Sequence, residues 1–272
     1  SSGGSSAPPI NATVFAVRGD NELIRFHPDV PDMVEVIATI TPLDGGEQII
    51  DIDFRSAEGD QGLYALTNAG RLLIVDPDSG EATEVAGFVP PFAVDPELVA
   101  AMDFNPTGQG ALRLLDRAGE SRRVAPPFDE EGLTDGALGY LADALVAAAY
   151  SHPAPGGDQT ALFAIDIEAA RLMRIGGLPA GGGDCDEDRP YPEDNPNCGA
   201  VFEVGPLGVD VTAVGGYDIV QLGLINEHYA VLEVEESRAI YALDAGNGAA
   251  TAVSDALDID DIIGLVAQYE GG

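Results

Sequence analysis

The sequence has no lysine and no tryptophan, and its 272 residues include only two cysteines and three histidines. All twelve basic residues are arginines, and 47 acidic residues outnumber them to give a formal net charge of −35. Such a surface repels phosphate backbones and anionic lipid headgroups, so neither a nucleic-acid partner nor membrane-surface binding is expected. The acidic side chains either keep the protein soluble in a salty medium or bind cationic partners or a divalent metal.

Long hydrophobic runs and common catalytic motifs are also missing. The nearest candidate span, from Leu138 to Tyr150, is short and contains Asp143, so no transmembrane segment is expected. No serine lies in a Gly-x-Ser-x-Gly elbow, and no glycine-rich phosphate loop precedes a helix. A histidine-based hydrolase is therefore poorly supported. The absence of tryptophan likewise weakens the case for a soluble module that binds a sugar or peptide through exposed aromatic side chains.

The sequence does contain a repeated phrase. An aromatic residue, alanine and an aliphatic residue open hairpin-like segments at residues 15–17, 64–66, 163–165 and 241–243. Short alternating or apolar runs surround these segments and are separated by Gly, Pro, Asp and Asn, a pattern typical of β-strands and turns. Repetition on this scale indicates a modular fold in which each unit covers the apolar faces of its neighbours.

These repeats predict an all-β fold, a β-propeller of four-stranded blades. Four strands in about 45 to 55 residues correspond to one blade, and five blades are expected. The segment Ile262–Ala267 resembles a first strand without its blade, and residues 13–40 resemble a blade without its first strand. Pairing of the C-terminal strand with the N-terminal blade would close the ring and remove exposed sheet edges. The alternatives are six blades, if Leu207–Thr212 begins its own unit, or an open pair of β-sandwiches.

The chain divides into a linker and one domain. Residues 1–12 are expected to form a flexible Ser/Gly/Pro linker, and residues 13–268 a single propeller domain. An acidic insertion bracketed by cysteines interrupts this domain at residues 181–199. A Ser/Gly-rich start follows the lipid-bearing cysteine of many bacterial surface lipoproteins, so one interpretation is a lipid anchor upstream of Ser1.

Several short phrases resemble a known family. They are Ile52–Arg55, Leu63–Leu66, Gly70–Leu72, Leu207–Asp210 and Gly264–Val266. Together they resemble a family of exported bacterial domains of unknown function with predicted β-propeller-like repeats. The resemblance implies a propeller fold and an extracellular or cell-surface location, and it supplies no catalytic residues. The acidic insertion is an addition to the pattern of this family.

The insertion is the sharpest local feature. Cys185 and Cys198 flank a short loop with little core, and a disulfide between them is the favoured interpretation. Clustered carboxylates without histidine favour calcium over zinc or copper. The candidate calcium ligands are Asp184, Asp186, Glu187, Asp188 and Asp194. Arg189 stands where an EF-hand requires glycine, so the alternatives are a non-standard calcium site and a solvated acidic loop.

A second set of acidic residues recurs on or beside the expected first strands. In a propeller these strands line the central channel, where a ring of carboxylates could hold a cation. The alternative is that these side chains bond to backbone groups near the axis and set the strand register. The candidate channel carboxylates are Asp51, Asp53, Asp103, Asp210 and Asp218.

The sequence favours a non-catalytic, exported propeller that acts as a binding or self-assembling module, for example in a surface layer or filament. Its partners would be other copies of the chain or surface components, and its one expected cofactor is calcium. The alternative function is a metal-dependent hydrolase with its site in the propeller channel. That alternative predicts a divalent ion held beside an open pocket, and a channel filled by apolar side chains would exclude it.

Overall fold

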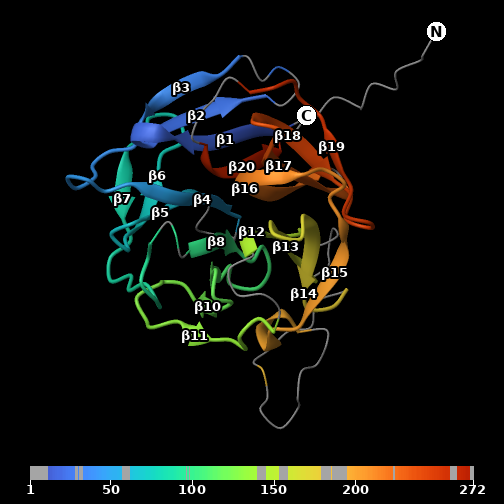
Figure 1. Ribbon diagram of the computed structural model, residues 1–272. Coiled ribbons are helices and arrows are strands. Elements are labelled where there is room, and N and C mark those ends of the chain that lie inside the picture. Colours follow the sequence, from blue (N-terminus) through green and yellow to red (C-terminus); the bar gives the residue numbers. More distant parts are fainter. Residues whose placement is uncertain are drawn as a thin grey trace.

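The computed structural model describes most of the chain (Figure 1). The described residues are 12–27, 30, 33–56, 62–95, 97, 99–139, 145–152, 159–178, 185, 195–222, 224–257 and 262–269. Their regular structure is β-strand, apart from two 3-10 helices, η1 (Gly19–Asn21) and η2 (Pro196–Cys198). Among these residues, no helix has both the length and the apolar character needed to cross a membrane. The expected linker lies outside them except for Ala12, where the first strand begins.

The strands form five four-stranded antiparallel sheets, the blades of a propeller. Counted outward from the axis, the first strands are β4 (Ile49–Arg55), β8 (Val99–Phe104), β12 (Leu145–Tyr150), β16 (Val211–Leu222) and β20 (Ile263–Tyr269). The second strands are β1 (Ala12–Arg18), β5 (Gly62–Thr67), β9 (Leu112–Asp116), β13 (Leu162–Asp166) and β17 (Ile225–Val234). The third strands are β2 (Glu22–Phe26), β6 (Leu72–Val75), β10 (Ser121–Val124), β14 (Arg171–Ile175) and β18 (Ser237–Leu243). The fourth strands are β3 (Glu35–Thr39), β7 (Ala82–Glu84), β11 (Leu133–Thr134), β15 (Val201–Pro206) and β19 (Ala250–Ala252).

This arrangement confirms the predicted five-bladed propeller. The sheets follow one another around a common centre in chain order (Figure 1). The segment considered as the start of a sixth blade instead connects β15 to β16, and its last residues, Val211 and Thr212, open β16. Five clusters of buried apolar side chains lie in the described part of the chain, one between each pair of neighbouring blades. Burial of these faces drives the blades together.

The C-terminal strand completes the N-terminal blade, as predicted. β20 pairs antiparallel with β1, placing Val14 opposite Ala267 and Ala16 opposite Leu265. The start of the chain thus supplies three strands of this blade and the end supplies the fourth (Figure 1). The ring closes through this shared sheet, so the propeller has no open gap between its first and last blades.

The repeated phrase lies in second strands in three blades and in a third strand in the last blade. Ala16, Ala65 and Ala164 lie at the centre of β1, β5 and β13 and are fully buried. In the last blade the equivalent alanine is Ala230 of β17, whereas residues 241–243 lie in the third strand, β18. The two strands are paired, with Ala230 opposite Tyr241, and both carry the same alternation of side chains.

Glycines let the first strands approach closely where the ring closes. A Cβ atom at Gly216 of β16 would lie 2.5 Å from the backbone nitrogen of Leu265 in β20. A Cβ atom at Gly264 would lie 2.9 Å from the backbone nitrogen of Ile52 in β4, and the φ angle of Gly264 is +66°, which favours glycine. Backbone therefore packs against backbone at this end of the channel.

Candidate functional site

Aspartates on the first strands connect neighbouring blades at the axis. The Oδ2 atom of Asp53 in β4 accepts a hydrogen bond from the N–H of Phe104 in β8 at 2.7 Å. The Oδ1 atom of Asp103 in β8 accepts one from the N–H of Tyr150 in β12 at 3.3 Å. A first strand is the inner edge of its sheet, so each carboxylate satisfies a backbone donor that the sheet does not pair.

Asp218 makes the corresponding contact at the ring closure. Its Oδ2 atom accepts a hydrogen bond from the N–H of Ala267 in β20 at 2.7 Å. Its Oδ1 atom accepts a second bond, also 2.7 Å long, from the N–H of Ile219. Both oxygens of this carboxylate are thus bonded to the backbone of the two strands that meet at the closure.

The structure brings Asp53, Asp103 and Asp218 together. One carboxylate oxygen from each lies within 4.8 Å of the others, and each residue is 7% exposed. The positions that correspond to these aspartates are occupied by Ala149 in β12 and by Val266 in β20. Each of these two residues comes directly before a residue whose N–H donates to an aspartate of the neighbouring first strand. We call Asp53, Asp103 and Asp218 the axial carboxylates.

Burial raises the pKa of each axial carboxylate, and the charges of neighbouring aspartates raise those of Asp53 and Asp103 further. Desolvation is the largest cause for all three. The charge of Asp218 further raises the pKa of Asp53, and the charge of Asp53 further raises that of Asp103. The backbone donors oppose these shifts, since they favour the ionised form. In the described part of the chain no arginine forms an ion pair with these groups. The cluster therefore holds its protons to a higher pH than exposed aspartates do, and a bound cation would oppose this.

The other two candidate channel carboxylates lie elsewhere. Asp51 precedes Asp53 by two residues in β4 and lies toward the opposite end of the channel. Burial raises the pKa of Asp51 to about 7, although its carboxylate accepts hydrogen bonds from the N–H groups of Met102 and Ile52. Asp210 is exposed in the connection before β16 and lines neither of the cavities described below.

A cavity of about 560 Å³ opens beside the axial carboxylates, at the end of the channel where the first strands finish. Its lining includes His152 and Gln221. The side chain of Asn226 holds His152 by its backbone: Oδ1 accepts from the N–H and Nδ2 donates to the carbonyl oxygen, both at 2.9 Å. The neighbouring Ser151 hydroxyl accepts a hydrogen bond from the N–H of Ala161. We call this space the acidic cavity.

A smaller cavity of about 220 Å³ lies at the other end of the channel, where the first strands begin. Most of its lining residues are aliphatic residues and glycines from all five first strands, and about half of the surface that they expose to the cavity is polar. Its charged residues are Asp51 and Arg117. We call this space the apolar cavity. Since the axial carboxylates lie on the far side of Asp51, the two cavities differ in chemistry as well as in size.

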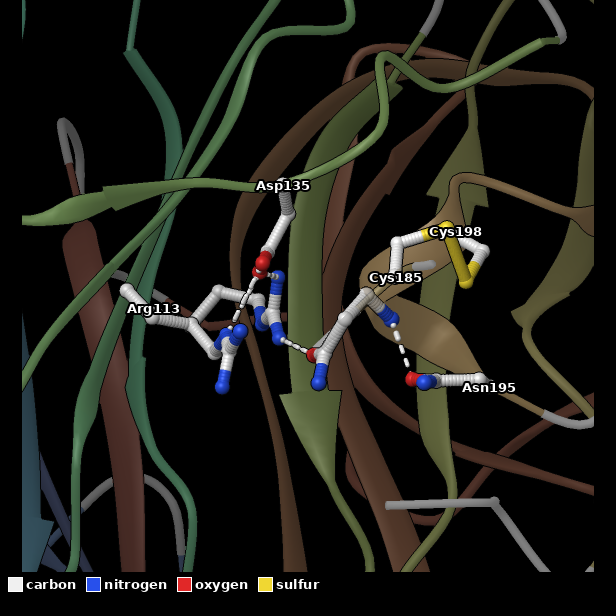
Figure 2. Close-up of a disulfide and its surroundings, with 7 residues drawn as sticks. Arg113, Asp135, Cys185, Asn195 and Cys198 are labelled. Atoms are coloured by element: carbon white, nitrogen blue, oxygen red, sulfur yellow. Dashed lines mark hydrogen bonds and ion pairs between the residues drawn. A yellow bond between two sulfur atoms is a disulfide. The ribbon is translucent and has the colours of Figure 1, made fainter. Parts of the chain in front are cut away.

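The predicted disulfide between Cys185 and Cys198 is present (Figure 2). Cys198 ends the helix η2 and is fully buried, so this end of the insertion is attached to the propeller core. The candidate calcium ligands Asp184, Asp186, Glu187, Asp188 and Asp194 lie outside the described residues.

A buried arginine joins two blades beside the disulfide. Arg113 of β9 donates to Oδ2 of Asp135 at 2.8 Å and to Oδ1 of Asn197 at 2.5 Å. It also donates to the hydroxyl of Tyr150 at 2.6 Å. Figure 2 shows Arg113 between Asp135 and the part of the chain that carries Cys198. These charge-assisted hydrogen bonds anchor the base of the insertion to the neighbouring blade. Nothing in the sequence singled out Arg113 or Asn226, because their partners are distant along the chain.

The fold resembles solved structures at low sequence identity. The crystal structure of an exo-1,5-alpha-L-arabinanase from a bovine ruminal metagenomic library has a TM-score of 0.55 and 11% identity, over 90% of this chain and 94% of that chain. A structural genomics protein of unknown function from Bacteroides thetaiotaomicron has a TM-score of 0.52 and 12% identity, over 94% of this chain. The chain spans 60% of the length of the latter protein. At these identities the similarity concerns the fold alone. No curated protein matches the sequence.

A family model matches residues 22–266. This range covers most of the chain, including the three axial carboxylates, Arg117 and the cysteine-bracketed insertion. The family is described as a domain of unknown function, which agrees with the resemblance found in the short repeated phrases. The chain belongs to the family Domain of unknown function (DUF4394).

Proposed function

We propose that this chain is a non-catalytic binding propeller, exported to the cell surface, that holds one calcium ion on its axial carboxylates and binds its ligand in the acidic cavity. The observation that carries the proposal is the convergence of three buried carboxylate oxygens beside an open cavity of about 560 Å³. A bound cation would offset the repulsion among these groups. The disulfide between Cys185 and Cys198 supports export, since disulfides persist in oxidising compartments.

The spacing of the axial carboxylates accommodates calcium. Calcium binds oxygen at about 2.3–2.6 Å, so two oxygens on one ion lie at most about 5.2 Å apart. The three carboxylate oxygens lie within 4.8 Å of one another. A set of carboxylates without histidine or cysteine suits a hard cation such as calcium, and the remaining ligands would be water or oxygens of the bound ligand.

The hydrogen bonds of the axial carboxylates support a non-catalytic role. Both oxygens of Asp218 accept backbone N–H bonds, and Asp53 and Asp103 each hold an N–H of the next blade. A general acid or a nucleophile must direct a proton or a free oxygen at its substrate. Asp218 uses both of its oxygens to join strands at the axis, and Asp53 and Asp103 each use one oxygen in this way.

Calcium titration of the purified chain tests the proposal. After removal of metal with EDTA, calorimetry should detect one calcium site that Asp103→Asn weakens at least about tenfold, a difference of about 1.4 kcal/mol. Asp210→Asn is the matched control, because Asp210 is exposed and lies outside the acidic cavity, and it should bind as the wild type does. The double variant Asp186→Asn/Asp188→Asn separates any binding by the insertion. A wild-type chain without saturable calcium binding would contradict the proposal.

Other copies of the chain, or components of the surface, are the partners in this proposal. A net charge of −35 keeps copies apart at low salt, and calcium or salt reduces that repulsion. Leu224 and Ile225, at the β16–β17 turn, are 78% and 62% exposed and offer an apolar contact. Sedimentation velocity and negative-stain microscopy should detect assemblies with calcium. Single monodisperse propellers both with and without calcium would count against assembly.

A hydrolase is the second candidate, favoured by raised pKa values of carboxylic acids next to an open cavity. Glycosidases pair a protonated carboxyl group with an ionised one, and the fold resembles that of an arabinanase. The acidic cavity is open, so the channel does not meet the condition that would exclude this alternative. Incubation with 1,5-α-arabino-oligosaccharides and calcium, followed by chromatography, should release no product. Turnover that Asp53→Asn abolishes would replace the binding proposal by this one.

A further inference from the structure

Arg117 stands apart from the other described arginines. It forms no hydrogen bond or ion pair with any described residue, and its Nε atom is buried. Every other described arginine donates to a carboxylate, hydroxyl or carbonyl oxygen; these are Arg18, Arg25, Arg55, Arg71, Arg113, Arg122, Arg123, Arg171, Arg174 and Arg238. In a chain with 47 acidic residues, acceptors for a guanidinium group are abundant. A buried donor without an acceptor costs free energy. A ligand that accepts a hydrogen bond from Arg117 would remove this cost.

The fold holds Arg117 against the apolar cavity. The residue lies in the turn between β9 and β10 and reaches the end of the channel where the first strands begin. Aliphatic side chains from three different blades contribute to the walls there, namely Val99, Val146 and Ile263. The guanidinium group of Arg117 therefore faces a space with aliphatic side chains and polar groups in about equal share, and Asp51 is the other charged residue of its lining.

We propose that the apolar cavity is a second ligand site, in which Arg117 binds the carboxylate of a small aliphatic carboxylic acid. The planar guanidinium group matches a carboxylate with two parallel hydrogen bonds. The volume of about 220 Å³ corresponds to about seven water molecules at roughly 30 Å³ each, which suits a short acid with its alkyl chain against the aliphatic walls. Asp51 and the net charge of −35 disfavour a multiply charged anion such as phosphate. This site is independent of the calcium site in the acidic cavity.

Nuclear magnetic resonance of the arginine side chains tests the proposal directly. The Nε–H signal of Arg117 is assigned by its absence in Arg117→Gln, and sodium butyrate is titrated at constant ionic strength and pH 6. We expect a saturable shift of this signal in the wild-type chain. Butyramide has the same shape without the charge, and it should bind at least tenfold more weakly. Inorganic phosphate should also bind more weakly than butyrate.

Two variants separate the ligand contact from a structural effect. Arg117→Gln should lose butyrate binding, measured by saturation-transfer difference spectroscopy, whereas Arg171→Gln should retain it, since Arg171 pairs with Glu203 on the surface. Asp53→Asn should also retain it, so failure of the calcium proposal would leave this result unaffected. The proposal is overturned if butyrate does not saturate the wild-type chain, if butyramide or phosphate binds as tightly as butyrate, or if Arg117→Gln binds butyrate as the wild type does. The ligand comparison on the wild-type chain decides the question even if Arg117→Gln fails to fold.

Discussion

The Oδ2 atom of Asp218 accepts a 2.7 Å hydrogen bond from the N–H of Ala267, which connects the first strand of the last blade to the strand that closes the ring. On its other side the same strand, β20, is paired along its length with β1. Asp218 is also one of the axial carboxylates. The closure of the propeller and the proposed calcium site therefore share a side chain, so a change in the charge of Asp218 affects both.

Removal of the Asp218 carboxylate should destabilise the fold. In Asp218→Ala the N–H groups of Ala267 and Ile219 lose their acceptor, and we expect the free energy of unfolding to fall by about 1–3 kcal/mol. Urea unfolding at pH 5, followed by circular dichroism, measures this loss while protonation limits the repulsion among the axial carboxylates. Asp210→Ala, at an exposed position, should change stability by less than about 0.5 kcal/mol. Equal stability of Asp218→Ala and the wild type would contradict the role assigned to this bond.

Stability should fall as the pH rises. The pKa values of Asp51 and the axial carboxylates are raised in the folded protein, so the native state binds more protons than the unfolded state. This contribution is fully present below about pH 4, the pKa range of an unfolded aspartate. It is lost as the pH rises through the folded values, which include about 7 for Asp51. Between pH 5 and pH 8 in EDTA, we expect the free energy of unfolding to drop by more than about 1.4 kcal/mol, the equivalent of one pKa unit.

The double variant Asp53→Asn/Asp103→Asn provides the control for this pH dependence. Its unfolding free energy should change less between pH 5 and pH 8, because two of the raised carboxyl groups are gone. Calcium at pH 8 should stabilise the wild type more than it stabilises this variant. If the free energy of unfolding has the same slope against pH in the wild type and in the variant, Asp53 and Asp103 do not cause this pH dependence.

Gly216→Ala should impair ring closure. A Cβ atom there would lie 2.5 Å from the backbone nitrogen of Leu265, and a strand backbone cannot move aside as a flexible side chain can. We expect a loss of at least about 2 kcal/mol, toward the upper part of the range for overpacking. Gly45→Ala is the matched control, because its Cβ atom would meet nothing within 4 Å. Thermal unfolding of the two variants side by side tests the prediction, which a wild-type melting temperature for Gly216→Ala would refute.

Arg113→Leu should be strongly destabilising. The substitution leaves the buried acceptors of Asn197 and Tyr150 without this donor and weakens the pairing of Asp135, and breaking a buried pair costs about 3–5 kcal/mol. Arg171→Leu breaks an exposed pair with Glu203 and should cost less than about 1 kcal/mol. Denaturant unfolding with the disulfide intact compares the two. Similar losses for both variants would show that the Arg113 contacts add nothing beyond those of a surface pair.

The blade count and the ring closure could be predicted because the evidence for them is local. Each hairpin consists of two short strand-like segments joined by a turn. The start of the chain lacked the first strand of a blade, and the end of the chain supplied one. The repeated phrase at residues 241–243 lies in a third strand, whereas its other three copies lie in second strands. Two adjacent strands of one antiparallel sheet carry the same alternation, so local pattern cannot rank β17 and β18 by their distance from the axis.

Prediction of the candidate site was less complete. Asp53, Asp103 and Asp218 were identified one by one as channel carboxylates, but Asp210 was included with them although it is exposed. Whether an aspartate lies in the channel or at the surface depends on where the first strand begins and on the direction of the side chain. The residues of the turn before β16 indicate neither. Within the described part of the chain, Arg117 lacks a hydrogen-bond partner because of the residues that the fold places around it, so no sequence motif could have identified this.

The order of residues along the chain was thus sufficient to establish a closed ring of five small sheets, because periodicity and turns act between neighbours in the sequence. Packing around the axis alone decided that three carboxylates from three blades meet, and that an arginine from a hairpin turn faces a cavity at the end of the channel. These contacts join residues that are far apart along the chain, so their distances and burial arise only when all five blades are assembled.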